Sequence, residues 1–513
     1  MRYILSIMFT ACFHVILGQV KDFEEYKRQR ERDMKQFGDD YKRGLDSLRS
    51  ARDKAFTRML EGNWTREELF ETPMVDATPK PEVPPVFVPS EKEPDINPTI
   101  IHAEPSPEEP LDSPDETSVE KTEAPEVAPS MPEPIEEDEA LSPALRTERR
   151  YGSKFTMRRD TLFGNEWMLP VISGKWPVLN GDPNPSSISA YWKDCSEREY
   201  EDLLACIQFQ RSAYGLSDWG TYQMLQKLAA WNFKRDHDRL LFQWFILVQL
   251  GYDARMMYGD QQVVLTLPFD DMLYSHTYFE VGTKKYFVLQ ENAPRTLYTY
   301  GQQHEGAKDP MTLRSNLASL YPERWIDRTF QFQFAGQREQ VRIPFLYHRV
   351  RYARSLPQTE LNYYFHQPVA SSFAHALHTA LDARLSELSG DREKVRYLYG
   401  LVCQSIPYQT DQEQFQEEKF CLPEEVLAYP YADCEDRTFL LNALIRELIG
   451  LETIGLNYPG HVAMAVRLNQ QNQSDAIVEF DGVDYVFCDP TFIGADLGMM
   501  PQVYRNQRPE VFR

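Results

Sequence analysis

The chain has 513 residues and a formal net charge of −23, so it is too long for a single hydrophobic core, and two or three folded units are expected. Between Pro73 and Pro143 lie 17 of the 35 prolines and 19 acidic residues, against three lysines or arginines, which leaves the rest of the chain only mildly acidic. Because no run of lysine and arginine is present, the composition argues against a nucleic-acid partner.

The first 18 residues combine one arginine with an apolar run and predict a secretory signal peptide that is cleaved after Gly18. An N-terminal membrane anchor is one alternative, but the run of roughly 15 apolar residues is shorter than the about 20 that a span requires. Lipid attachment at Cys12, after a weakly lipobox-like Phe-Thr-Ala, is another alternative. No later segment is long and apolar enough to cross a membrane. We therefore expect an exported protein, periplasmic or secreted, without a transmembrane span in the mature chain.

Residues 19–72 are predicted to form a charged helical arm, because apolar side chains recur mostly at steps of three and four from Phe23 to Leu60. One helix, or a hairpin, packed on the protein's own body would explain this seam. The alternative is a coiled coil that docks a partner or self-associates. Residues 73–148, which are rich in proline and acidic side chains, are predicted to be a disordered, extended linker.

From residue 149 onward the chain alternates helical and strand patterns. The predicted helices are 222–250, 393–405 and 434–448, and the predicted strands are 263–267, 277–280, 285–289, 462–467, 476–480 and 485–488. In both halves the helices precede an antiparallel set of strands, which indicates an α+β class.

Two segments of this globular part resemble each other. Residues 236–267 align with residues 434–466 with one small gap, and the stretch GTKKYFVL that follows the first matches GVDYVFC after the second. Each segment has an apolar helix, a glycine near its end, and two short strands joined by a tyrosine-containing turn. We interpret this as a degenerate internal duplication, with a coincidence of common α+β patterning as the alternative.

The second segment holds a cysteine, a histidine and an aspartate in an order that suits nucleophilic catalysis. Cys434 opens a helix, whose positive end favours the reactive thiolate. His461 begins a strand and could take the thiol proton and return it to a leaving group. Asp489 closes a strand and could orient the imidazole. Glu435 and Asp436 oppose thiolate formation, so a Cys–His ion pair would have to outweigh them.

The three blocks DCEDRTFLLNALIREL, PGHVAMAV and YVFCDPT resemble the transglutaminase-like superfamily of papain-like cysteine enzymes. The resemblance covers residues 346–513 and implies a helix packed on an antiparallel sheet, with Cys434 as nucleophile, His461 as general base and acid, and Asp489 as orienting carboxylate. It implies acyl transfer through a thioester on the cysteine, without metal or cofactor. Hydrolysis of amides in peptides or proteins of the cell envelope is preferred, because water needs no acceptor pocket, and protein crosslinking is the variant.

The same resemblance assigns residues 149–345 to a degenerate transglutaminase-like domain. The positions that match the triad are Asp236, Gln261 or Gln262, and Gln290, so the chemistry would be lost there. This degenerate domain and the long linker support a second hypothesis, a non-catalytic binding or scaffold protein of the envelope.

Two features of the unit with the triad stay open. Papain-like enzymes stabilise the oxyanion with the nucleophile's own backbone N–H and one further donor, for which Gln404 and Tyr408 are the candidates. Cys434 is also one of six cysteines outside the predicted signal peptide, and a disulfide to Cys421 or Cys488 would block it in an oxidising compartment.

Overall fold

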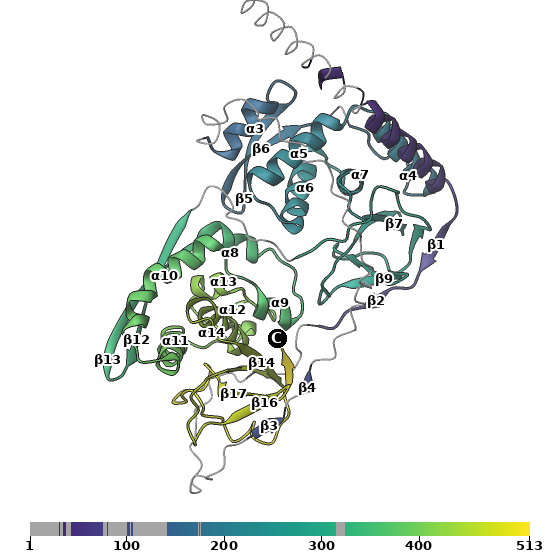
Figure 1. The fold of residues 1–513 in the computed structure, drawn as a ribbon. Coiled ribbons are helices and arrows are strands. Elements are labelled where there is room, and N and C mark those ends of the chain that lie inside the picture. The colour runs from purple at the N-terminus through teal and green to yellow at the C-terminus, as the bar shows by residue number, and fades with distance from the viewer. Residues whose placement is uncertain are drawn as a thin grey trace, which may run out of the picture.

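The computed structural model describes residues 30, 34–36, 40, 43–74, 80, 100–102, 104–105, 141–172, 174, 176–313 and 324–513. The predicted signal peptide, with Cys12, and most of the predicted linker lie outside this part of the chain. The described residues form a mixture of helices and largely antiparallel sheets, which confirms the α+β class in its coarse form (Figure 1). No described helix combines the length with the apolar character that crossing a bilayer requires.

The first folded unit combines a group of helices with a curled sheet. Its helices are α3 (Pro143–Tyr151), α4 (Pro185–Ser196), α5 (Glu201–Ala213), α6 (Asp218–Asn232) and α7 (Asp236–Gln249), and its strands are β5 (Thr156–Leu162), β6 (Asn165–Val171), β7 (Arg255–Gly259), β8 (Gln262–Pro268), β9 (Thr277–Val281), β10 (Lys284–Val288) and β11 (Leu297–Tyr300). Strands β5 and β6 form a separate hairpin, and the others lie in the order β11-β7-β8-β10-β9, each antiparallel to its neighbours.

The second folded unit follows a long hairpin, β12 (Trp325–Phe334) and β13 (Gln337–Leu346), which lies along α10 and α11 (Figure 1). Its helices are α8 (Tyr347–Ala353), α9 (Leu361–His366), α10 (Ser371–Ser386), α11 (Asp391–Ser405), α12 (Asp411–Gln414), α13 (Pro423–Ala428) and α14 (Cys434–Leu448), and its strands are β14 (Thr453–Tyr458), β15 (His461–Val466), β16 (Ile477–Phe480), β17 (Val483–Cys488) and β18 (Glu510–Phe512). These strands lie in the order β18-β14-β15-β17-β16, again antiparallel.

The two curled sheets therefore have the same strand order, and in both a helix, α7 or α14, leads into the first strand. A stretch from the N-terminal part of the chain also joins the two edges of each sheet. In the first, β1 (Trp64–Glu67) pairs with β11 and β2 (Phe70–Glu71) pairs with β9. In the second, β3 (Ile100–His102) pairs with β16 and β4 (Glu104–Pro105) pairs with β18. Each sheet is thus closed into a ring of strands, and part of the predicted linker closes the second ring.

The described part of the arm includes a helix over residues 43–60 that packs on the first unit. Phe56 meets Trp192 edge-on with ring centroids 4.7 Å apart, and Leu60 is fully buried. Leu45 and Leu48, on the same seam, are about half exposed, at 48 % and 49 %. Packing on the protein's own body is therefore observed for residues 43–60, whereas a coiled coil further toward the N-terminus stays a prediction. The helix ends at residue 60, and the last part of the predicted arm forms β1 and β2 instead.

The single helix predicted over residues 222–250 is wrong in one respect, because it is two helices, α6 and α7, separated by residues 233–235. The side-chain amide of Asn232 donates to the carbonyl groups of Leu228 and Pro170, at 2.9 and 3.2 Å. It thereby ties the last turn of α6 to β6. The residue that follows, Phe233, has extended backbone angles, so the helix ends there and a new one starts. The predicted helix over residues 434–448 agrees with α14 at both ends.

Candidate functional site

Cys434 is the first residue of α14, as the sequence predicts. The N-cap is Asp433, whose carboxylate accepts the backbone N–H of Asp436 at 3.4 Å. The helix is buried from its first turn through Ile445. Because the whole N-terminal end of α14 lies inside the unit, the Cys434 side chain is 0 % exposed.

His461 and Asp489 form a hydrogen-bonded pair at the ends of two adjacent strands. His461 begins β15, Asp489 follows β17 directly, and Nε2 of the histidine lies 2.7 Å from Oδ2 of the aspartate. The other carboxylate oxygen accepts the backbone N–H of Thr491 at 2.9 Å. Because a carboxylate accepts hydrogen bonds, Nε2 is the donor of this pair, and Nδ1 is the other ring nitrogen. This Nδ1 is buried, and no described group hydrogen-bonds to it.

Two hydrogen bonds hold the first turns of α14 against the strands that carry this pair. Thr438 Oγ1 donates to the carbonyl of Val462, the residue after the histidine, at 3.2 Å. The Arg437 guanidinium donates to the carbonyl of Pro490, the residue after the aspartate, at 3.1 Å. The start of α14, the start of β15 and the end of β17 therefore meet, and the three residues of the predicted triad are brought to one region of the second unit.

The thiol of Cys434 is nevertheless in its protonated form. Its Sγ donates to Glu435 Oε2 at 3.0 Å, and no hydrogen bond joins it to His461. Burial raises the pKa of the Cys434 thiol well above its usual value, and the carboxylates of Glu435 and Asp433 raise it further, against the opposing charge of Lys80. The structure thus holds a resting thiol, not the Cys–His ion pair that a nucleophile of this kind requires.

Lys80 lies among four carboxylates beside the cysteine. Its Nζ is 2.6 Å from Glu418, 2.7 Å from Asp433 and 3.8 Å from Asp411, and it also bonds to Glu435. The carboxylate oxygens of the four acids lie within 4.8 Å of one another, a spacing that could hold a metal ion, and the Lys80 ammonium lies among them. Burial alone would lower the pKa of Lys80, but Glu435 and Asp433 raise it well above its usual value, so the group is charged.

The acids around Lys80 do not all carry a charge. Burial raises the pKa of Asp411 to about 9, with further contributions from Asp436 and Glu435, and burial likewise raises the pKa of Asp433 well above its usual value. Burial would also raise the pKa of Glu435, but the Lys80 ammonium outweighs it and the pKa is lowered. Glu435 is therefore ionised. One of its oxygens faces the ammonium, and the other accepts the hydrogen bond from the thiol.

Aromatic side chains cover the histidine. The Tyr504 ring stacks on the imidazole of His461, with centroids 5.0 Å apart and planes 10° from parallel, and Phe492 meets it edge-on at 5.6 Å. Both belong to the segment between β17 and β18. Together with the buried thiol, they leave the predicted triad closed from solvent.

The two candidate oxyanion donors have different surroundings. Gln404 bonds through its side-chain amide to both backbone groups of Gln333 on β12, at 2.9 and 3.2 Å, and this contact is exposed. Tyr408 lies beside Ala432, just before α14, where burial raises the pKa of its hydroxyl and the charge of a Cys434 thiolate would raise it further. Of the two, only Tyr408 is near the thiol.

All six described cysteines are free thiols, including Cys421 and Cys488. Both are fully buried, Cys421 between α12 and α13 and Cys488 at the end of β17. The disulfide that would block Cys434 is thus absent from the described residues.

In the first unit, the positions that match the triad carry other side chains. Asp236 begins α7 as the cysteine begins α14, and Gln262 begins β8 as the histidine begins β15, so Gln262, not Gln261, is the counterpart of the histidine. Continuing the β8–β10 register by one residue places Leu289 opposite Leu265, and Gln290 after it, as Asp489 follows Cys488. The Gln290 amide pairs with both backbone groups of Leu265, at 2.9 and 3.0 Å.

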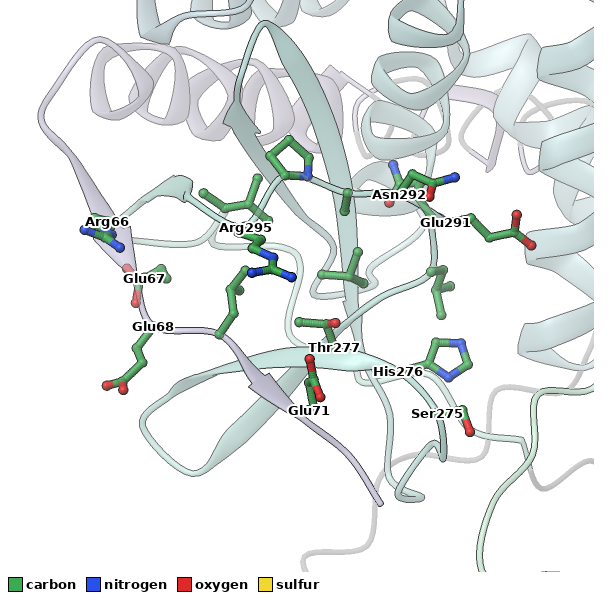
Figure 2. Close-up of a pocket in the computed structure, with 17 residues that line it drawn as sticks. Arg66, Glu67, Glu68, Glu71, Ser275, His276, Thr277, Glu291, Asn292 and Arg295 are labelled. Atoms are coloured by element: carbon green, nitrogen blue, oxygen red, sulfur yellow. The ribbon is translucent and has the colours of Figure 1, made fainter. Parts of the chain in front are cut away.

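An open cavity of about 920 Å³ lies beside Gln290 in the first unit (Figure 2). It is bounded by the stretch around β1 and β2, by the start of β9 and by the loop between β10 and β11. Figure 2 shows Arg295 extending toward the middle of this cavity, with Glu71, His276 and Glu291 around it. The cavity is lined by charges of both signs, and it is a candidate binding surface.

Sequence reasoning missed the residues that close the site. Lys80 is one of three basic residues in the proline-rich stretch, and that rarity was its only signal. Arg437 was hidden within the apolar pattern of the helix, although an arginine so close to the nucleophile is unusual for a buried position. Tyr504 and Phe492 lie in a segment with no periodic pattern.

No protein-family model matches the chain, and no similar protein was found among the curated proteins or the solved structures.

Proposed function

We propose that the second unit is a cysteine acyl-transfer enzyme of the transglutaminase-like kind, with Cys434 as nucleophile, His461 as general base and acid, and Asp489 as orienting carboxylate. One observation carries this proposal. A buried histidine is held through Nε2 by an aspartate at 2.7 Å, and its free Nδ1 lies in the region where a cysteine begins a helix. Few structural roles require this combination, because a buried ring nitrogen without a partner costs stability.

The chemistry follows from these roles. The imidazole Nδ1 takes the thiol proton, and the thiolate attacks an amide carbonyl to form a carbon–sulfur bond. The C–N bond then breaks, and the leaving amine takes the proton back from the imidazolium. Water attacks the thioester next, which releases the acid and restores the thiol. Attack by an amine instead would give crosslinking. Hydrolysis is preferred, and the Tyr408 hydroxyl is the proposed second oxyanion donor.

We also propose that the first unit is a degenerate copy of the second. The common strand order and the helix that leads into each sheet support an internal duplication. The closing stretches add nothing to this support, because they pair antiparallel in the first ring and parallel in the second. The predicted signal peptide supports a location outside the cytoplasm, with peptides or proteins of the cell envelope as substrates.

A second candidate function is a non-catalytic binding or scaffold protein. The observation that favours it is the closed site, in which a fully buried thiol is bonded to Glu435. The charged cavity of the first unit would then be the working surface.

The experiment that separates the two candidates is amide hydrolysis by the full chain, followed as new amino groups released from peptide substrates, with incorporation of a fluorescent amine as the readout of transfer. Cys434→Ala should abolish either product. Cys206→Ala, which removes a buried thiol from the first unit, is the matched control and should retain activity. Amide turnover that persists in Cys434→Ala would exclude the acyl-transfer proposal.

A further inference from the structure

The contact between Lys80 and the start of α14 brings together residues that are far apart in the sequence. Lys80 and Glu435 are separated by 355 residues, yet they are bonded to each other. The lysine side chain is only 3 % exposed. Lysine is seldom buried in this way unless it is paired, and here it is paired four times.

The four acids that hold Lys80 come from two segments, one of which contains Cys434. Asp411 and Glu418 belong to α12 and the stretch after it, whereas Asp433 and Glu435 are the immediate neighbours of Cys434. The ammonium therefore joins the α12 segment to the start of α14. Without it, the ionised Glu435 would be buried with no counter-ion, and separation of the two segments would relieve this cost by letting water reach the carboxylate.

Lys80 also acts on the thiol through Glu435. One oxygen of this carboxylate bonds to the ammonium and the other accepts the hydrogen bond from Cys434 Sγ. As long as Lys80 holds Glu435 in this orientation, the thiol donates to a carboxylate and not to the free Nδ1 of His461.

The segment that contains Lys80 is fastened at both ends. Before it, β2 pairs with β9 of the first ring, and after it, β3 and β4 close the second ring. Lys80 thus lies in the connection between the two rings. Because this connection is held at both ends, the ammonium stays at a high effective concentration near its carboxylates.

We propose that Lys80 is a tethered blocking group that holds the second unit in a latent state, and that the cysteine becomes accessible when the Lys80 ammonium leaves the carboxylates. This regulatory role rests on the proposed acyl-transfer function for its biological meaning. The blocking itself can be measured on the thiol without any substrate.

The test is the rate of alkylation of each cysteine by iodoacetamide in the full chain, followed by peptide mass mapping. Lys80→Met should raise the rate at Cys434 at least tenfold, because the fully buried Sγ can react only after the site opens. Lys284→Met is the matched control. It removes a lysine that bonds to Asp253 at 2.7 Å in the first unit, and it should leave the rate at Cys434 unchanged.

A milder variant protects the test against misfolding. Glu418 is partly exposed, at 26 %, and does not adjoin the cysteine, so Glu418→Gln should loosen Lys80 while the fold is retained, with a rise of several-fold at Cys434. Cys488, which is buried at the end of β17 in the second unit, reports unfolding of that unit and should not change. The blocking role is overturned if the rate at Cys434 is unchanged in both variants, or if the rate at Cys488 rises in parallel.

The same variants distinguish the two proposals. A faster Cys434 in Glu418→Gln, together with no turnover of any amide, would support the block and reject the enzyme. Turnover by the unmutated chain, with the same Cys434 alkylation rate in both variants, would support the enzyme and reject the block.

Discussion

The two folded units have the same arrangement of strands, but the positions that match the predicted triad are buried in one unit and largely exposed in the other. In the second, the residues at the helix start, the strand start and the strand end are Cys434, His461 and Asp489, all nearly inaccessible to solvent. In the first, the corresponding Asp236 and Gln262 are exposed. The scaffold therefore defines where a triad would lie, while the side chains and their burial decide whether chemistry is available there.

Burial also explains why charged groups gather beside the cysteine of the second unit. A nucleophile held within a unit needs polar neighbours, and each buried charge among them needs a partner. The second unit meets this need with Lys80 and its carboxylates. The first has no buried nucleophile at the matching position, and Lys284 there is 41 % exposed on the side chain.

Substitution of the strand-start residue should give the largest difference between the units. His461→Ala removes the base that activates the thiol, so we expect activity to fall by roughly a thousandfold. Gln262→Ala, at the corresponding position of the first unit, should leave turnover within twofold of the unmutated chain. Steady-state amide hydrolysis measures both, and an equal loss in the two variants would mean that the first unit also takes part in the chemistry.

Loss of the buried lysine should be the next largest effect. Lys80→Met leaves the ionised Glu435 buried without its counter-ion, and we expect the free energy of unfolding of the second unit to fall by about 3 kcal/mol. Lys284→Met breaks a partly exposed pair and should cost less than about 1 kcal/mol. Urea denaturation measures both losses, and similar values would show that the Lys80 cluster is no more stabilising than a surface ion pair.

The pH dependence of stability should also separate the units. The pKa of Asp411 is raised to about 9, so this group keeps its proton in the folded state between about pH 4 and 9 and loses it on unfolding. Because the unfolded state then binds fewer protons, stability falls as the pH rises through this window, by up to about 1.4 kcal/mol per pH unit for one proton. Asp433 and Asp436, whose pKa values are also raised, act in the same direction.

This dependence can be assigned to one unit because all eight tryptophans lie before residue 346. Tryptophan fluorescence therefore follows the first unit and the hairpin, whereas far-UV circular dichroism follows the whole chain. As the pH rises from 5 to 8, the urea midpoint of the second unit, followed by circular dichroism, should move to a lower urea concentration. The midpoint followed by tryptophan fluorescence should stay in place. Parallel movement of both midpoints would contradict the assignment to the carboxylate cluster.

The smallest of these effects should come from substitution of Gln290, the residue of the first unit that matches Asp489. Gln290 bonds to the backbone of Leu265, so Gln290→Ala should lower the stability of the first unit by about 1 kcal/mol without changing turnover. Asp489→Ala should instead lower turnover strongly. Fluorescence-detected unfolding and the hydrolysis assay distinguish these results, and a loss of turnover in Gln290→Ala would argue against a purely structural role.

The elements around the candidate site could be predicted because their signals are local. Asp433 caps the helix, apolar residues recur through it, and the strands after it are short apolar runs, so the predicted bounds of α14 and the strand-end position of Asp489 agree with the structure. The hairpin of β12 and β13 was missed, although Phe330 and Phe332 alternate with polar residues as a half-buried strand requires.

The contacts that close the site could not be predicted, because they join segments that share no local pattern. Nothing around Lys80 in the sequence indicates that its side chain is buried. Ile100 and Ile101 occur in a proline-rich, acidic stretch whose average composition predicts disorder, and it is the edges of the second sheet that give them partners. The positions of Cys434, His461 and Asp489 at the ends of their elements thus follow from local sequence, whereas their accessibility depends on long-range contacts.

The strand that closes the second ring has a consequence for how the protein is made. Residues 100–105 are synthesised long before β16 and β18, the strands they join, so the ring cannot be completed until nearly the whole chain has emerged. A fragment that begins at residue 346 would lack this strand as well as Lys80. It would have two open sheet edges, and such edges promote association between chains. The second folded unit is therefore not a contiguous piece of the sequence.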